Sequence, residues 1–156
     1  MRPLVATLAL GLGLALAGAA GAATVKVENA WIRATPPGAP TAAGYATIVN
    51  DGSAPDRLLS ASTLAAASVE PHTMSTAGGI MRMRAATGGL PIGPKATLRL
   101  SPDGDHLMLM GVKRPLKAGE HVRMVLKFQR AGDVAADFAV RLAPPPAAGA
   151  RGGMRM

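Results

Sequence analysis

The chain alternates hydrophobic and polar positions in short segments that are separated by turn residues. Alternation with a period of two is typical of strands that bury one face. Gly, Pro, Asn and Asp interrupt the pattern, as in Pro36-Pro37-Gly38 and Asn50-Asp51-Gly52. The segments that predict strands are residues 25–33, 42–50, 57–64, 79–85, 96–100, 106–112, 122–130 and 134–142.

These segments, with no helical period after residue 23, predict an all-β fold, a Greek-key antiparallel sandwich or small barrel. The roughly 133 residues that follow fit one domain with a single core. Pro71-His72 falls between predicted strands, so we expect a strand end or a loop there. Residues 143–156 are rich in Pro, Ala and Gly and predict a disordered tail.

The first 23 residues predict a secretory signal. Arg2 precedes an apolar run over 4–16, and small residues follow up to a cleavage point after Ala22 or Ala23. The run is shorter than the roughly 20 residues of a membrane span, and no cysteine is present for a lipoprotein anchor. We therefore expect general secretion to a bacterial periplasm, with no stable membrane anchor after cleavage and a mature domain over 24–142.

The net charge of the chain limits the classes of binding partner that we expect. The net charge is +8, and cleavage after residue 23 removes one arginine and no acidic residue, leaving about +7. Basic residues are scattered, aromatic residues are few, and the predicted export separates the chain from cytoplasmic nucleic acid. We expect no nucleic acid partner, and steering towards an acidic protein or a membrane surface.

Candidate metal ligands stand out because the chain has nine methionines and no cysteine. Thioether sulfur favours Cu(I), and imidazole binds copper in either oxidation state. In the predicted strand over 106–112, His106, Met108 and Met110 share one face, because side chains alternate across a sheet. Met81 and Met83 share a face in the strand over 79–85. Copper is therefore the first metal to consider.

Other interpretations of these residues exist. Methionine is a common core filler, and Met124 is in phase with apolar neighbours, so we predict that it packs in the core. His121 is in phase with charged residues and is predicted to face solvent. The roles of Met74, Met81 and Met110 stay open between core packing and support of a metal site.

Several function classes are excluded or set aside. A blue-copper site needs a cysteine ligand and covalent haem attachment needs Cys-x-x-Cys-His, and the chain has no cysteine. No nucleophile motif indicates an enzyme. A β-sandwich module that binds a protein or peptide without metal remains open.

The order and spacing of four residues resemble a known family. His72, ten further residues, Met83, and then His106-x-Met108 followed by a Gly-Val-Lys-Arg-Pro-Leu segment are similar to the periplasmic copper chaperones of the PCu(A)C type. The segments Asn29-Ala-Trp-Ile-Arg and Gly79-Ile-Met-Arg-Met-Arg extend the resemblance over most of the mature chain. The stretch between Met83 and His106 is one residue longer than in the family pattern, within a turn-rich region.

The resemblance implies a cupredoxin-like fold and a Cu(I) site formed by His72, Met83, His106 and Met108. It further implies delivery of copper to the CuA centre of cytochrome c oxidase subunit II, or to another copper-assembly protein. A periplasmic copper buffer or resistance protein is the alternative. Binding of Cu(II) stays open, because the tail offers only Met154 and Met156 as donors.

Overall fold

The computed structural model describes residues 24–145, which contain ten strands. The strands are β1 (Val25–Arg33), β2 (Thr41–Asn50), β3 (Asp56–Ser62), β4 (Ala66–Ala77), β5 (Ile80–Ala85), β6 (Leu90–Ile92), β7 (Thr97–Arg99), β8 (His106–Val112), β9 (His121–Phe128) and β10 (Gly132–Arg141). The described residues include no helix, so none of them forms a helical membrane span. The predicted signal peptide and residues 146–156 of the predicted tail lie outside the described residues.

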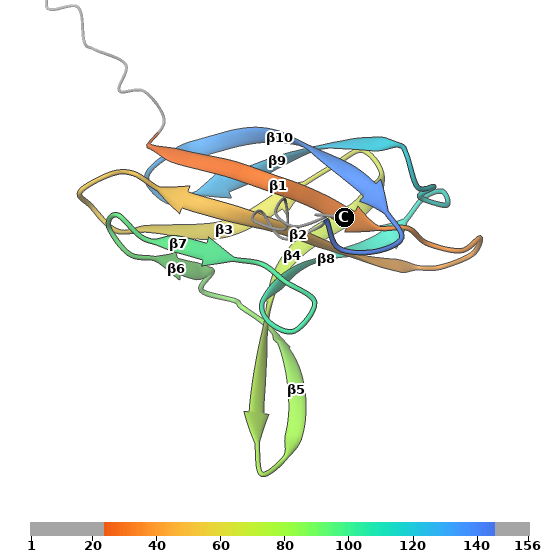
Figure 1. Ribbon diagram of the computed structural model, residues 1–156, viewed down its shortest axis with the longest axis horizontal. Helices are drawn as coiled ribbons and strands as arrows, with labels where there is room; N and C mark the ends of the chain where they lie inside the picture. The colour runs from red at the N-terminus through yellow and green to blue at the C-terminus, as the bar shows by residue number, and fades with distance from the viewer. Residues whose placement is uncertain (1–23, 146–156) are drawn as a thin grey trace, which may run out of the picture.

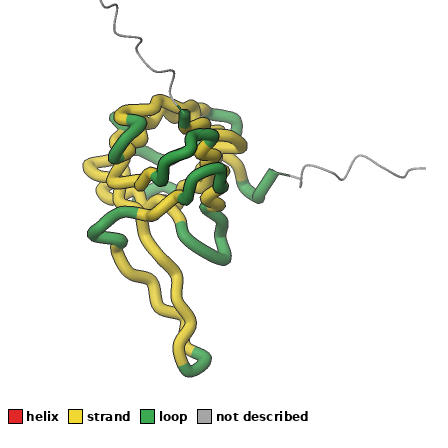
Figure 2. The backbone as a smooth tube through the Cα atoms, turned by 90° about the vertical axis from the view of Figure 1, so that its left-hand side faces the viewer, coloured by secondary structure: helices red, strands yellow, loops and turns green. Residues whose placement is uncertain are grey.

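Seven of the strands close into a barrel (Figures 1 and 2). The order is β4-β8-β2-β1-β10-β9-β3, and the ring closes because Ala61 of β3 pairs with Val69 of β4. The all-β barrel predicted from the sequence is confirmed. One pair departs from an antiparallel arrangement: β1 and β10 are parallel, with Trp31 opposite Ala139. These strands come from opposite ends of the domain, so no tight hairpin constrains their relative direction.

The interior of the barrel is filled by side chains from the inward-facing side of each alternating strand. Its largest fully buried side chains include Phe128, Phe138 and Met124. Burial of such side chains contributes about 1.5–3 kcal/mol each. The core position of Met124 and the exposure of His121 agree with the sequence predictions.

The expectation of a strand end or loop at Pro71-His72 is wrong, because both residues lie inside the 12-residue strand β4. Proline is disfavoured in strands because it cannot donate to the ladder. Here the Pro71 carbonyl accepts a hydrogen bond from the Ala86 N–H at 2.8 Å, beyond the end of β5. The nitrogen of Pro71 faces the same side, where the pairing with β3 has ended and that with β5 has not begun. The missing donor therefore costs little.

The second half of β4 and the whole of β5 leave the barrel as a two-stranded arm, residues 72–85 (Figures 1 and 2). Its turn consists of Gly78 and Gly79, whose φ angles of 61° and 77° suit the primed turns that match the twist of a hairpin. All six residues of β5 are exposed. The arm is therefore held by strand pairing and by its root in the barrel, with little burial of its own.

Candidate metal centre

The two predicted histidine ligands face each other on neighbouring strands. His72 of β4 is the direct cross-strand partner of His106 of β8. Directly opposed residues of an antiparallel pair project from the same face. Leu107 and Leu109 alternate with the predicted ligands and are fully buried in the core, which leaves His106 and Met108 on the outer face of β8 beside His72.

The third strand brings the remaining predicted ligand to the same face. Met83 of β5 pairs with Met74 of β4, two residues from His72, and Met81 pairs with Thr76. Met83 is thus a diagonal neighbour of His72, at the roughly 7–8 Å spacing that long side chains bridge. Met108 is a diagonal neighbour of His72 on the other side, because it pairs with Glu70. The register therefore sets one thioether on each side of the histidine pair.

The imidazole geometry fits two ligands of one metal. The ring centroids of His72 and His106 are 5.8 Å apart, with the planes at 47°. Two imidazoles on one metal have centroids roughly 4.5–6 Å apart, given metal–nitrogen bonds of about 2.0–2.1 Å. The Nδ1 of His106 lies 3.1 Å from the carbonyl oxygen of Gly104. When Nδ1–H donates to that oxygen, the lone pair of Nε2 remains for a metal, as in many sites where a second partner orients the ligand.

The imidazole of His72 is not satisfied by hydrogen bonds within residues 24–145. Both of its ring nitrogens are buried, and neither has a hydrogen-bond partner among the described residues. A buried polar group without a partner costs about 1–3 kcal/mol. A carboxylate oxygen of Glu70 approaches Nε2 to 3.5 Å without completing a hydrogen bond. A metal ion bound at His72 would satisfy this side chain.

Aromatic side chains support the buried edge of the histidine pair. The ring of Tyr45 lies 6.4 Å from that of His106, and Trp31 lies 4.7 Å from Tyr45. Burial raises the pKa of the Tyr45 phenol, an effect that the nearby Arg33 partly opposes. The phenol therefore stays neutral at ordinary pH and offers no anionic oxygen to a metal.

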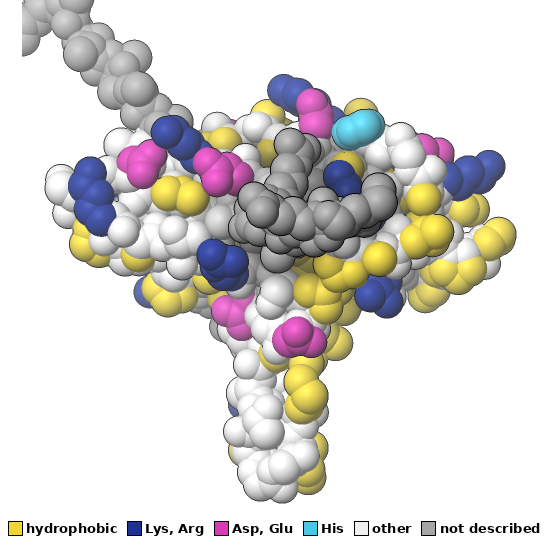
Figure 3. Space-filling view, in the orientation of Figure 1, with side chains coloured by type: hydrophobic (Ala, Val, Ile, Leu, Met, Phe, Trp, Pro, Cys, Tyr) yellow, Lys and Arg dark blue, Asp and Glu magenta, His cyan; other side chains and the backbone are white. Residues whose placement is uncertain are grey.

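Thioethers are the further donors beside the histidine pair. Within residues 24–145, no three His, Cys, Asp or Glu side chains gather as a metal-binding group, and the neighbouring side chains on the same face include Met83 and Met108. Met108 is half-buried, whereas Met81 and Met83 are 59% and 49% exposed, and Met110 is 39% exposed. Of the two roles left open for Met81 and Met110, core packing is therefore excluded. Figure 3 shows hydrophobic side chains along one side of the arm.

Sequence reasoning missed the parts of the site that depend on β4. Glu70 approaches His72 because both lie on the outer face of β4, two residues apart. Once residues 66–77 are known to form a strand, the alternation of Ser68, Glu70, His72 and Met74 follows directly. The hydrogen bond to Gly104 depends on a loop conformation that no sequence pattern indicates.

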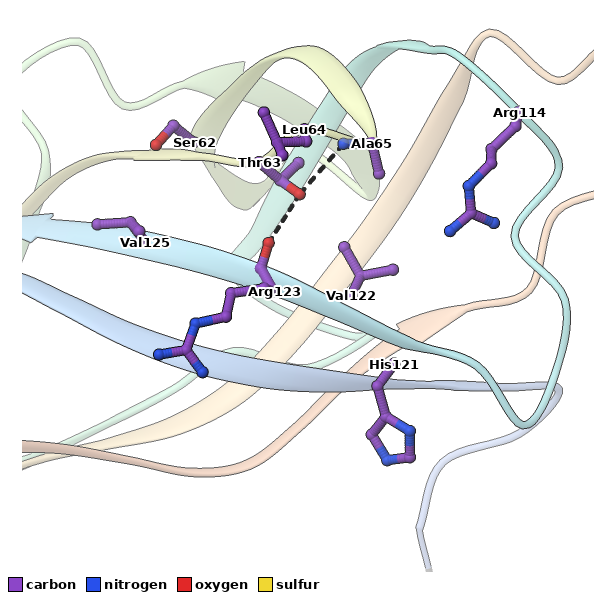
Figure 4. Close-up of a pocket in the computed structure, with 9 residues that line it drawn as sticks. All are labelled: Ser62, Thr63, Leu64, Ala65, Arg114, His121, Val122, Arg123 and Val125. Atoms are coloured by element: carbon purple, nitrogen blue, oxygen red, sulfur yellow. Dashed lines mark hydrogen bonds between the residues drawn. The ribbon is translucent and has the colours of Figure 1, made fainter.

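A separate pocket, shown in Figure 4, is lined by neither His72 nor His106. It has a volume of about 570 Å³ between the loop after β3 and the outer face of β9, and Arg114, His121 and Arg123 contribute to its lining. Glu120 and Asp137 pair with the two arginines. The pocket contains none of the predicted copper ligands and no methionine.

Comparison with known proteins identifies a family and relatives for this chain. Residues 25–140 match the model of the LpqE-like family, described as "Putative lipoprotein LpqE-like". A relative from Leifsonia xyli subsp. xyli (strain CTCB07), a lipoprotein by name (Lxx21020), is 36% identical over 104 residues. That match covers 67% of this chain and 61% of the relative, so the chain spans less than two thirds of the relative's length.

The solved structures that share the fold include a domain of PmoF1 and the protein DR1885. The apo PCuAC domain from PmoF1 is 29% identical, with a TM-score of 0.65, over 77% of this chain and 95% of that domain. The solution structure of the Cu(I) form of DR1885 from Deinococcus radiodurans is 37% identical, with a TM-score of 0.59, over 80% of this chain and 83% of the other. The resemblance to PCu(A)C proteins is confirmed by this likeness in sequence and structure. By its match over residues 25–140, the chain belongs to the LpqE-like family, with the all-β fold of the PCuAC domains.

Proposed function

We propose that this protein is an extracytoplasmic copper carrier that binds one Cu(I) through His72, His106, Met83 and Met108. The observation that carries the proposal is the opposed pair of histidines: the two buried ring nitrogens of His72 have no hydrogen-bond partner within residues 24–145, and the His106 ring lies against the Gly104 carbonyl. The structural relative DR1885 is known in a Cu(I) form, which supports the choice of metal. Export is supported by the apolar segment at residues 4–16 and by the lipoprotein names of the relatives.

The ligand set suits carriage because all four donors are neutral. Two imidazoles and two thioethers match the soft d¹⁰ Cu(I) ion without the charge of a thiolate. Thiolates bind Cu(I) more strongly than thioethers do, so an acceptor with cysteine ligands draws the metal from this site. An exposed Met83 at the edge of the site lets an acceptor ligand enter while the histidines still hold the ion.

The first prediction concerns stoichiometry and ligation. Titration of the protein with Cu(I), against a competing chelator under reducing conditions, should give one ion per chain, and X-ray absorption should show both nitrogen and sulfur neighbours. Met83→Leu or Met108→Leu should lower Cu(I) affinity at least roughly tenfold, about 1.4 kcal/mol, because leucine keeps the volume and removes the donor.

Met124→Leu is the matched control, because Met124 is fully buried in the core and the exchange is equally conservative. Its Cu(I) affinity should equal that of the wild type. Nitrogen and oxygen neighbours alone in the absorption spectrum, or unchanged affinity in both ligand variants, would contradict the proposed ligand set. An absence of copper binding would favour the metal-free binding module.

The second prediction concerns handover. The copper-loaded protein, mixed with the reduced, copper-free soluble domain of cytochrome c oxidase subunit II, should lose its Cu(I) to that domain, since the CuA ligands include thiolates. A strain that lacks the protein should show weakened oxidase activity, partly restored by added copper. Retention of copper beside the acceptor, with normal oxidase in the deletion strain, would instead identify a copper buffer or resistance protein.

A further inference from the structure

The arm carries two chemically different faces. Met74, Met81 and Met83 lie on the face that continues the histidine pair. Arg82 and Arg84 alternate with the methionines of β5 and lie on the opposite face, beside Ser75 and Thr73 of β4. All six residues of β5 are exposed. The arm thus presents soft donors on one side and guanidinium groups on the other.

Neither arginine of the arm forms an ion pair among the described residues, although the carboxylates of Glu70 and Asp105 lie at the root of the arm, beside His72 and the Met74 N–H. No aspartate or glutamate occurs between Glu70 and Asp103, a stretch that contains Arg82 and Arg84 as well as Lys95 and Arg99. Ion pairs within residues 24–145 join other basic residues to acidic ones, but none involves Arg82 or Arg84. The barrel, by contrast, pairs two exposed arginines, Arg114 with Glu120 and Arg123 with Asp137.

The arm also exposes several large apolar side chains that are not buried against the barrel. Ile80, Met81 and Met83 are 58%, 59% and 49% exposed within one six-residue strand. Exposed apolar surface beside charged side chains is typical of protein interaction sites. Because the arm is two strands wide and β5 forms its free edge, a partner that reaches Met83 meets the arginine side chains at the same edge.

We propose that the arm is the docking element for the copper-exchange partner, and that Arg82 and Arg84 recognise an acidic surface around that partner's metal site. The inference rests on the proposed function and adds the chemistry of the partner. Opposite charges at an interface accelerate encounter and fix orientation more than they raise affinity. The arginines therefore act on the rate of copper transfer, while His72 and His106 hold the ion.

Arginines on an edge strand have a second known use, since charged side chains discourage pairing with the edge strand of another copy. Reversal of the charge separates the two roles. Glutamates at positions 82 and 84 keep the edge charged and prevent such pairing, but they repel an acidic partner. A purely protective role predicts no change in transfer.

The test compares Arg82→Glu/Arg84→Glu with a control of the same net charge, Lys127→Glu/Arg130→Glu, on the exposed side of β9 and the turn after it. Each copper-loaded protein is mixed with the reduced, copper-free soluble domain of oxidase subunit II, and the rate of transfer is followed at low and at high salt. The wild type and the control should transfer faster at low salt. The arm variant should be roughly tenfold slower or more at low salt, with unchanged Cu(I) affinity.

Equal rates and equal salt dependence for wild type and arm variant would overturn the docking role and leave the carrier function intact. If the wild type transfers no copper, the handover proposal fails, and docking is then decided by amide shifts of the metal-free protein with the same domain. Shifts confined to residues 72–85 and abolished in the arm variant support docking, whereas shifts elsewhere or none at all overturn it.

Discussion

Replacement of His106 by alanine is expected to abolish tight Cu(I) binding. His106 is one of the two proposed nitrogen ligands and is buried, with its Nδ1 close to the Gly104 carbonyl oxygen. Loss of an outer partner of a metal ligand costs roughly 10–100-fold in affinity, so loss of the ligand itself should cost more than that. His72→Ala should have a similar effect, because its nitrogens are the other half of the pair. Competition with a Cu(I) chelator measures both.

His121→Ala provides the control for the histidine variants. His121 is exposed on β9 and belongs to a different face of the barrel. The Cu(I) affinity of the His121→Ala variant should therefore equal that of the wild type. Circular dichroism should show folded protein in all three variants. Tight copper binding that survives in both His72→Ala and His106→Ala would place the site elsewhere in the chain.

The second large effect is expected on stability, from the opposite face of the same strand. Leu109 is fully buried and lies between Met108 and Met110 on β8. Leu109→Ala should lower the free energy of unfolding by about 2–5 kcal/mol, because it removes buried methyl groups and leaves a cavity. The corresponding fall in Tm is roughly 8 °C or more for a domain of this size. Chemical and thermal unfolding of the metal-free protein measure it.

Met108→Leu is the paired control, one residue away on the same strand. It should unfold near the wild-type temperature and lose copper affinity, whereas Leu109→Ala should lose stability and keep copper affinity at temperatures where it remains folded. The two variants thus separate the faces of β8. Similar losses of stability in both would mean that Met108 serves the core rather than the metal.

Much of the barrel followed from its alternating pattern. The bounds of β1 and β8 were predicted without error, and β2, β9 and β10 within a residue or two. The prediction missed β4, because an alanine-rich start and Pro71 lower its apparent tendency to form a strand. It also missed the three-residue strand β6, whose length is too short for a periodic signal. Both β4 and β6 are stabilised by pairing with strands that are distant in the sequence, which compensates for their weak local preference for strand structure.

The site was predictable in composition but not in shape. Alternation within β8 correctly placed His106 and Met108 on one face. Resemblance to a family added His72 and Met83, whose role as ligands stays a prediction. What alternation could not supply was the register between β4, β5 and β8, since register depends on turn geometry and on long-range pairing. For the same reason, the sequence pattern does not predict that the arm projects from the barrel.

The parallel pairing of β1 with β10 also determines how this domain can be joined to others. Because neighbouring parallel strands start at the same end, the chain enters the barrel at one pole, near Val25, and leaves it at the other, near Arg141. Three strands, β4, β8 and β2, lie between β5 and β1 along the sheet. The barrel is therefore an in-line module: a tether or a reporter fused at either pole leaves the arm clear.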